Sequence, residues 1–380
     1  MDLSRRELLA ASALLLARPT EALTTAAPTR GVAPTATQAP GLTAVPKPII
    51  LCWNENPYGP SPAARAVISN AIPVSCRYPD EENKLLLEAI AAQERVPVDH
   101  LVTGTGSGEL LRALGFLYGR DGGEIVAALP TYSELTDYAQ GVGASVKFVP
   151  VDKELKHDLN AMRAAVTERT RAVYICNPNN PTGTALPREA LDAFITSVPD
   201  TVTTIVDEAY MDFADLYGVG SVSYLVDRGK RLVVLRTFSK IHGMAGIRMG
   251  YGIARPDIVK TLAAMTMTSP NIFAVRAARA SLGDRAFLTD TAHRILASRR
   301  KITTELTKLG LRYAVPQGNF VFFDTGMPLA QFTERMKARN ILVGRLFPPY
   351  DTWCRITIGT EPEVAAFLDA LHHVTAARPA

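Results

Sequence analysis

The sequence has 380 residues, of which 47% are hydrophobic, so it can bury a large core and we expect two domains. Its 41 basic and 37 acidic residues give a net charge of +4, without a basic tract or a basic stripe interleaved with aromatic residues, which argues against nucleic-acid binding. The four cysteines and six histidines lack metal-ligand spacing, so we expect no metal site. We interpret the cysteines as core thiols and leave open whether any of them form a disulfide.

The N-terminal residues resemble a twin-arginine export signal, because Arg5 and Arg6 precede an apolar run from Ala10 to Ala17. We therefore predict that residues 1–26 direct export to the periplasm; an ordinary amphipathic start would instead leave the protein in the cytoplasm. Residues 27–47 are rich in Ala, Pro and Thr, which predicts a disordered linker. No later segment has about 18 uninterrupted apolar residues, so we expect no membrane span after removal of the signal.

Residues 48–75 are predicted to form an N-terminal arm. Its stretch from Trp53 to Pro62 is rich in Asn, Pro and Gly, which indicates turns and excludes a core strand. Such an arm either connects elements or lies over a pocket, with Asn56 and Tyr58 pointing inward.

A predicted helix over residues 82–94 has Leu85, Leu86, Ala89 and Ile90 on its inner face. A Gly- and Ser-rich turn over residues 103–109 then opens a second helix. Free backbone N–H groups and the positive end of the helix dipole at such a turn, near Ser107 and Gly108, favour a phosphate ligand. Gly-rich turns are common, so this motif is weak by itself.

Short apolar strands alternate with helices along the next part of the chain, which predicts a mostly parallel sheet with helices on both faces. The predicted strands cover residues 124–129, 145–151, 171–176, 201–206, 231–235 and 251–254, with a helix at 158–165.

Polar residues suited to ligand binding or catalysis follow the ends of these strands, where α/β sheets bind their ligands. Tyr132 can stack on a flat aromatic ligand, and Asn180 lies in an irregular turn, residues 177–183, whose amides can donate to a ligand oxygen. Asp207 ends a buried strand, where a carboxylate requires a cationic partner such as a protonated heteroaromatic nitrogen. Lys240 follows the strand at 231–235 and has an amine able to hold an aldehyde cofactor as a Schiff base.

Phosphate ligands are indicated around this lysine by the hydroxyls of Thr237 and Ser239 and the guanidinium of Arg248. Each signal is weak alone, and a loop lysine is more often simply solvated. Their shared position at one rim of the predicted sheet makes the constellation strong.

The C-terminal part predicts a smaller α+β unit. Its helices are expected at residues 273–281, 285–309 and 329–339, and its strands at 319–323 and 355–358. We place the large domain at residues 76–270 and the small domain at 271–380. Arg345 and Arg355 are candidates for bidentate binding of a carboxylate if they face a pocket.

In order and spacing, these motifs resemble those of fold-type I pyridoxal-phosphate aminotransferases of class I/II, most closely the histidinol-phosphate aminotransferase-like branch. The resemblance runs from about residue 51 to 363. It rests on the segments 54–61, 77–80, 177–183, 207–210 and 355–359, together with Ser239-Lys240 and Arg248.

The resemblance implies a role for each matched residue. Lys240 would bind pyridoxal 5'-phosphate covalently and move the α-proton, and Asp207 would pair with its ring nitrogen. Asn180 and Tyr210 would hydrogen-bond the phenolic oxygen, and Tyr132 would stack on the ring. The other implied contacts are to the phosphate, by Ser107, Gly108, Ser239, Arg248 and, from the second subunit of a homodimer, Tyr78, and to the substrate, by Asn56, Tyr58, Arg345 and Arg355.

The reaction implied is transfer of an amino group between an amino acid, or a histidinol-phosphate-like amine, and a 2-oxo acid by a ping-pong mechanism. Decarboxylation, cyclisation or oxidation at the same site is the alternative, and a cofactor-binding protein without turnover is a second one. Three features depart from the branch. Gly108 precedes Glu109 where the branch usually has an Asp, and Ile241-His242 replaces the usual small-then-aromatic pair after the lysine. Arg345 lies one residue further from its strand than is usual. The amino donor stays open.

Overall fold

The computed structural model describes residues 47–266 and 269–376. The predicted signal, and the predicted linker apart from Lys47, therefore lie outside the described residues. Within the described part, no helix is long and apolar enough to cross a membrane.

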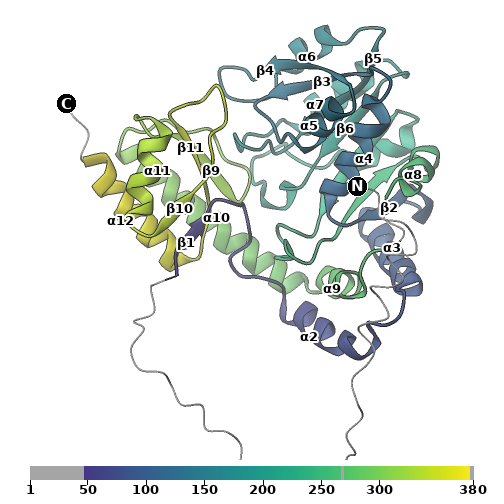
Figure 1. Cartoon of the computed structure of the whole chain (residues 1–380), viewed down its shortest axis with the longest axis horizontal. Helices are drawn as coiled ribbons and strands as arrows, with labels where there is room; N and C mark the ends of the chain where they lie inside the picture. Colours follow the sequence, from purple (N-terminus) through teal and green to yellow (C-terminus); the bar gives the residue numbers. More distant parts are fainter. Residues whose placement is uncertain (1–46, 267–268, 377–380) are drawn as a thin grey trace, which may run out of the picture. The chain divides into compact units, whose positions relative to one another are not determined.

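The larger part of the described chain is built on a seven-stranded sheet in the order β2-β8-β7-β6-β5-β3-β4 (Figure 1). Strand β8 runs antiparallel to both of its neighbours, and the other four pairs are parallel. The strands are β2 (Leu101–Gly104), β3 (Glu124–Leu129), β4 (Ser145–Pro150), β5 (Thr170–Cys176), β6 (Thr203–Asp207), β7 (Leu232–Thr237) and β8 (Gly250–Ala254).

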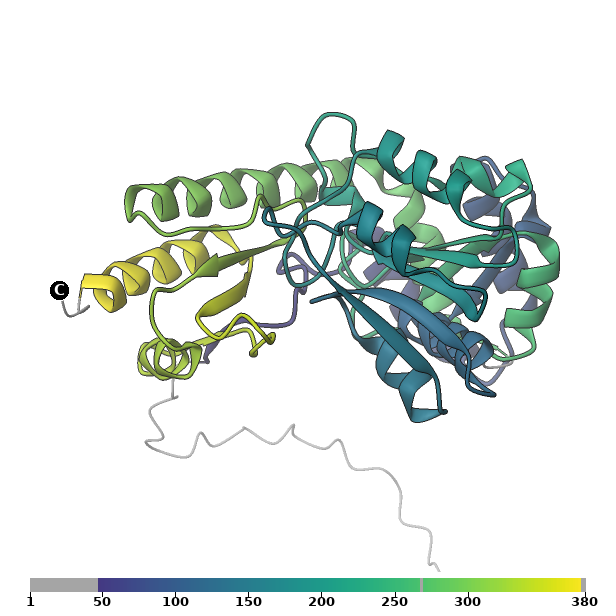
Figure 2. The same cartoon turned by 90° about the horizontal axis from the view of Figure 1, so that it is seen from above.

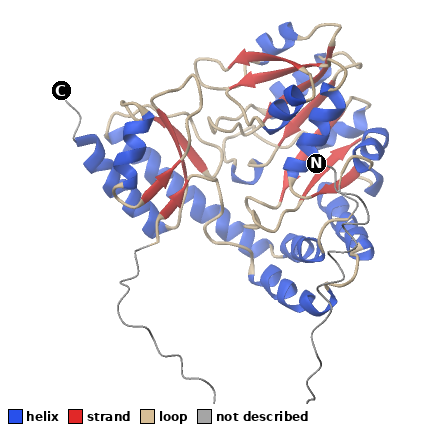
Figure 3. Cartoon of the chain, in the orientation of Figure 1, coloured by secondary structure: helices blue, strands red, loops and turns tan. Residues whose placement is uncertain are grey.

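Helices cover both faces of this sheet (Figure 3). Side chains alternate along the strands, so Val173 and Ile175 of β5 belong to one core while Ala172 and Tyr174 belong to the other. The first core is completed by α2 (Pro62–Ala71), α3 (Asp80–Glu94), α6 (Leu159–Ala165), α7 (Arg188–Ser197) and α9 (Ile272–Gly283). The second is completed by α4 (Ser107–Gly119), α5 (Glu134–Gly141) and α8 (Pro256–Ala263).

The smaller α+β part holds two two-stranded sheets and its own apolar core. Strand β9 (Phe320–Asp324) pairs antiparallel with β11 (Trp353–Thr357), and β1 (Ile49–Leu51) pairs parallel with β10 (Ile341–Val343). Helix α10 (Arg285–Lys308) follows α9 and runs alongside β9 and β11, as Figure 2 shows from above. Helices α11 (Leu329–Lys337) and α12 (Glu361–Ala376) complete this part.

The predicted α/β class with a mostly parallel sheet is confirmed, and every predicted strand and helix occurs within a few residues of its expected bounds. Elements for which no bounds were predicted include α2, α5, α7, α8, α12, β1, β2, β10 and the short 3-10 helices at Ile72–Val74, Val98–His100, Met211–Phe213 and Ser223–Arg228. Helix α9, which the sequence assigned to the small domain, packs its alanines into the first core of the large sheet.

Two sequence expectations about burial were wrong. Leu85 was placed on the inner face of its helix but is 45% exposed, because Leu86 and Ile90 take the buried face of α3. Cys76 is exposed in the loop before α3 and is no core thiol, whereas Cys176 and Cys354 are buried. All four cysteines are free.

Candidate active site

Most of the predicted site residues of the large part lie at the carboxyl ends of five strands. Because β8 is antiparallel to both β2 and β7, strand β2 points the same way as β3, β5, β6 and β7. The loops that leave these strands enclose a cavity of about 260 Å³. Its lining consists of Trp53, Asn54, Ser107, Gly108, Tyr132, Asn180, Asp207, Ala209, Tyr210, Thr237, Ser239, Lys240, Ala245, Arg248, Arg345 and Arg355.

Lys240 projects its amine into this cavity three residues beyond the end of β7. Its Nζ donates to the backbone oxygen of Asn54 at 3.0 Å and approaches that of Trp53 at 3.5 Å. Burial, with Arg355 and Arg248 nearby, lowers the pKa of Lys240 to about 8. An appreciable fraction of the amine is therefore neutral, and able to act as nucleophile or base, near neutral pH.

Asp207 ends β6 and is only 2% exposed. Its carboxylate accepts from the backbone N–H of Ala209 at 3.1 Å and, more weakly, from the hydroxyl of Tyr174 at 3.4 Å. Within residues 47–266 and 269–376 no cationic side chain comes within ion-pair distance of it, and burial raises the pKa of Asp207 to about 6. Because no cation of the described residues pairs with it, this carboxylate can pair with a cationic atom of a ligand.

Asn180 and Tyr210 contact each other in the lining of the cavity. The Nδ2 groups of Asn54 and Asn180 donate to the Tyr210 hydroxyl oxygen at 3.1 and 3.4 Å. Arg355 donates through Nη1 to Oδ1 of Asn180 at 2.6 Å, which fixes the orientation of that amide. Burial raises the pKa of Tyr210, so the phenol keeps its proton at neutral pH and can donate it to a ligand oxygen.

Part of the cavity lining has the features of an anion site. Helix α4 begins at Ser107 without a side-chain cap, so its first N–H groups and the positive end of its dipole face the cavity. Arg248 donates through Nη1 to Ser239 Oγ at 3.3 Å and has no carboxylate partner within ion-pair distance in the described part. Thr237 Oγ1 donates to the same Ser239 hydroxyl oxygen.

Tyr132 follows β3 and its ring forms part of the cavity wall. Burial, and Glu134 beside it, raise the pKa of Tyr132 to about 12. The ring is thus a neutral, mostly apolar surface that a flat ligand can stack against.

The two candidate substrate arginines differ in their surroundings. Arg355 opens into the cavity from β11, is 7% exposed, and donates through Nη2 to the backbone oxygen of Cys52 at 2.7 Å. Its Nε has no partner in the described chain. Arg345 is exposed at the rim, and its guanidinium lies 4.5 Å from the centre of the Phe347 ring.

Three predicted residues are not among those that line the cavity. Asn56 donates through Nδ2 to the backbone oxygen of Ile241 at 2.8 Å, so it holds the lysine loop from outside. Tyr58 packs against the small-domain core with Arg294 over its ring. Tyr78 is 85% exposed in the loop before α3, as a residue acting on a partner subunit would be.

Sequence reasoning did not select Trp53, Asn54, Ala209 or Ala245 as site residues, although all line the cavity. Asn54 is the most connected of them, since its side chain reaches Tyr210 and its carbonyl reaches Lys240. Its sequence signal was the Asn- and Pro-rich arm itself, and its left-handed backbone (φ 55°) is a conformation asparagine adopts more readily than most residues.

The comparisons with known proteins agree with this geometry. The family model described as "Aminotransferase class I and II" matches residues 46–371, and the chain belongs to that family. It has the fold-type I architecture and is a pyridoxal-phosphate-dependent aminotransferase.

A histidinol-phosphate aminotransferase from Moorella thermoacetica is 38% identical over 333 residues, 86% of each chain. An aromatic amino acid aminotransferase from Rhodococcus jostii is 37% identical over 330 residues, 85% of this chain and 89% of that protein. The crystal structure of histidinol-phosphate aminotransferase from Sinorhizobium meliloti in complex with pyridoxal-5'-phosphate superposes with a TM-score of 0.79 at 28% identity, covering 87% and 91% of the two chains.

The residues present fit this cofactor. The unpaired buried carboxylate of Asp207 suits a protonated ring nitrogen, and the α4 terminus with Arg248 suits a phosphate dianion. The ring of Tyr132 and the amine of Lys240 line the same cavity.

Proposed function

We propose that this chain transfers amino groups with Lys240 as its covalent anchor and proton carrier, and with Asp207 as the partner of the cofactor ring nitrogen. The observation that carries the proposal is a buried carboxylate, without a cationic partner in the described residues, that lines the same cavity as an amine of lowered pKa. When bound, pyridoxal phosphate supplies an electron sink for the negative charge left at the substrate's Cα after proton removal.

Lys240 performs two tasks in this assignment. Its Nζ would hold the aldehyde carbon of the bound cofactor, and when freed by a substrate amine it would take and return the Cα proton. A pKa of about 8 suits both tasks, because the neutral and protonated amine are then both populated near neutral pH.

The remaining cavity residues bind and orient. Arg248, Ser239, Ser107 and Gly108 hold the phosphate, and the ring of Tyr132 stacks on the cofactor. Asn180 and Tyr210, whose positions are fixed by Asn54 and Arg355, donate to the phenolic oxygen.

For the substrate, we assign the α-carboxylate to buried Arg355 and a second group to the rim formed by Arg345 and Trp53. An exposed guanidinium and an exposed indole that line one cavity can accept either an anionic group, as in a histidinol-phosphate-like amine, or an aromatic ring. The relatives named above act on both kinds of substrate by their names, so both are the first donors to test.

The decisive experiment follows the absorbance of the cofactor-loaded protein while amines are added one at a time, without a 2-oxo acid. Conversion to the pyridoxamine form with one donor class supports transamination and identifies the donor. Release of carbon dioxide or a cyclised product with return of the original spectrum would overturn it. Lys240→Ala is expected to bind the cofactor without covalent attachment and to lose turnover.

We further propose a homodimer in which the partner subunit's Tyr78 reaches the phosphate, because an exposed tyrosine follows the arm in a loop outside its own cavity. We also propose periplasmic location through the arginine pair at positions 5 and 6. Cell fractionation of the wild type and of Arg5→Lys/Arg6→Lys checks the second proposal, and a wild-type protein confined to the cytoplasm would overturn it.

A further inference from the structure

Asn319 is fully buried at the start of β9 and contacts the arm that covers the site. Its Nδ2 donates to two successive backbone oxygens, those of Asn54 and Glu55, both at 3.1 Å. Because both neighbours are acceptors, the nitrogen of this amide must face them and its orientation is fixed.

The Asn54 carbonyl held in this way is the one that accepts from Lys240 at 3.0 Å. Its residue is fixed at two further points, since the backbone N–H of Asn54 donates to Thr357 Oγ1 at 2.8 Å and its side chain donates to Tyr210. One carbonyl oxygen therefore joins the reacting amine to a buried amide of the small domain.

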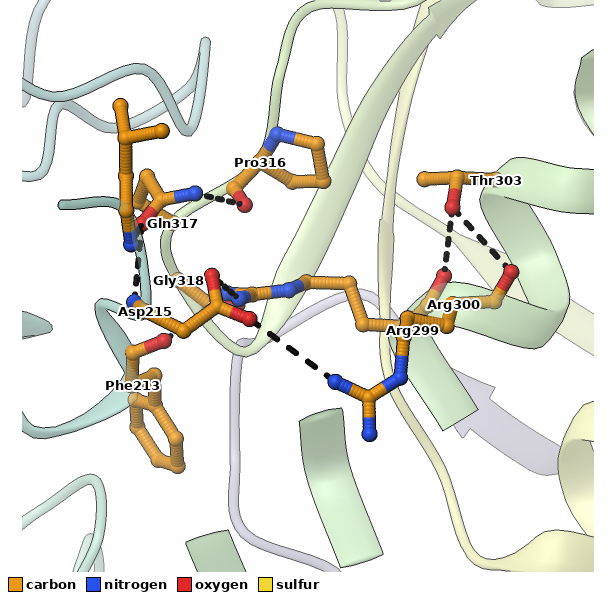
Figure 4. A network of polar contacts seen from close by, with 9 residues as sticks. Phe213, Asp215, Arg299, Arg300, Thr303, Pro316, Gln317 and Gly318 are labelled. Carbon is orange, nitrogen blue, oxygen red and sulfur yellow. Dashed lines mark hydrogen bonds and ion pairs between the residues drawn. The ribbon is translucent and has the colours of Figure 1, made fainter. Parts of the chain in front are cut away.

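The segment that carries Asn319 is itself tied to the loops around the site. The backbone N–H of Gln317 donates to the oxygen of Gly183, and its side-chain Oε1 accepts from the N–H groups of Asp215 and Leu216. Figure 4 shows Gln317 beside Gly318 and Asp215, two residues that Arg299 contacts. The backbone segment that precedes Asn319 is thus held in place by hydrogen bonds to the neighbouring loops.

The amide oxygen of Asn319 has no hydrogen-bond partner in the described part of the chain. A buried acceptor in that state costs about 1–3 kcal/mol, a cost that an apolar residue would avoid. The contribution of the amide to the structure therefore lies in its Nδ2 donations to the arm.

We propose that Asn319 is a positioning residue: it holds the Asn54 carbonyl in place so that this carbonyl can accept a hydrogen bond from the free amine of Lys240, that is, the amine not bonded to the cofactor. The inference rests on the function proposed for Lys240 and adds a residue that touches neither cofactor nor substrate. A neutral amine that donates N–H to a fixed carbonyl has its rotation fixed, so its lone pair is directed away from the arm and toward the cavity.

Several charged groups face this amine besides the carbonyl. Asp207 and Glu55 favour its protonated form, whereas Arg355 and Arg248 disfavour it, and the Tyr210 ring lies 5.4 Å away. The Asn54 carbonyl also favours the protonated form, because it accepts from the ammonium group. Loosening that carbonyl is expected to lower the pKa of Lys240 further.

The test is the rate at which cofactor-free enzyme captures pyridoxal phosphate, followed by absorbance between about pH 6 and 10. Capture joins Nζ to the aldehyde carbon with loss of one water and requires the neutral amine, so its midpoint reports the pKa of Lys240. In the wild type the midpoint is expected near pH 8. In Asn319→Ala we expect it to fall by about half a unit or more.

Gln317→Ala is the matched control, since it removes buried hydrogen bonds of the same segment without touching Asn54. It is expected to lose a similar amount of thermal stability and to keep the wild-type midpoint. Asn319→Ser, whose single hydroxyl cannot reach both arm oxygens, serves if the alanine variant does not fold and is expected to lower the midpoint by a smaller amount.

The inference is overturned if the midpoint of Asn319→Ala stays at the wild-type value or rises, and the same holds for Asn319→Ser where that variant is used. It is also overturned if the midpoint of Gln317→Ala falls by an equal amount. Failure of the proposed function has a different signature. Lys240→Ala would then still capture the cofactor covalently, whatever the behaviour of the Asn319 variants.

Discussion

The guanidinium of Arg248 lies directly over the backbone of Gly106, so closely that a Cβ on that glycine would come within 2.3 Å of Nη2. Gly106 precedes α4 with φ of +82°, a conformation that strains any side chain. The cradle for the phosphate therefore depends on a missing methyl group as much as on the arginine.

Gly106→Ala should push Arg248 away from the α4 terminus. We expect the affinity for pyridoxal phosphate to fall about 10- to 100-fold, the size of one lost charge-assisted hydrogen bond. Titration of cofactor-free protein by absorbance measures it. Gly141→Ala is the control, because a Cβ there meets nothing within 4 Å, and an equal loss in both variants would contradict the assignment.

Asp207→Asn should separate stability from activity. Because the pKa of Asp207 is raised from 3.8 to about 6 in the folded protein, its ionisation does not affect stability below pH 3.8. Between pH 3.8 and about 6 it destabilises the fold increasingly, and above that pH the loss of stability is constant. At neutral pH the variant is expected to stabilise cofactor-free protein by up to about 3 kcal/mol.

The same substitution should lower turnover by about 10²–10⁴-fold, because the ring nitrogen loses its charged partner. Thermal unfolding of the cofactor-free protein and single-turnover rates measure the two effects. A variant that is both less stable without cofactor and fully active would refute the role of Asp207.

Two buried histidines should make the fold sensitive to acid. Burial lowers the pKa of His157 and of His242 to about 4. Both are neutral and without penalty above pH 6.5, and stability is lost as the pH falls from 6.5 toward 4, by on the order of 3 kcal/mol for each.

His157→Leu should flatten this slope, since the buried ring of His157 has at most a weak contact with the Asn179 side chain in the described residues. His242 bonds through Nδ1 to Ser281 Oγ at 2.7 Å, so replacing it should also cost stability at neutral pH. Unfolding free energies in urea at pH 7.5, 6 and 5 compare the variants. A slope that is unchanged in His157→Leu would show that this histidine does not titrate with unfolding.

Mixed dimers test the role proposed for the partner subunit's Tyr78. Lys240→Ala and Tyr78→Phe, each impaired alone, are combined by refolding or co-expression. Random pairing should restore about one quarter of the sites, because half of the dimers are mixed and each has one intact site. Absence of any restoration would place the action of Tyr78 within its own subunit.

The sequence predicted those site residues whose side chains act at strand ends. Asp207 and Lys240 follow buried apolar strands, and the rule that parallel strands present their carboxyl ends together was sufficient to bring them to one rim. Arg345 and Arg355 were also recognised, although they come from the other part of the fold.

Asn54 could not be found in the same way, because its contact with Lys240 is made by a backbone carbonyl, which every residue has. Asn319 was assigned to a strand start, where its burial and its two acceptors depend on an arm more than two hundred residues earlier. Helix α7 has Leu191, Phe194 and Ile195 at helical spacing, an apolar pattern that is short and is flanked by turn residues on both sides.

The parallel pairing of β1 with β10 has a consequence for the order in which the protein assembles. Strand β1 leaves the ribosome well before its partner β10, which is encoded nearly three hundred positions later. A pairing of such sequence separation forms late, because the entropy of closing the intervening loop has to be met first. The arm residue that touches the reacting lysine follows β1 directly, so the nascent chain is expected to acquire its large sheet well before it acquires a working site.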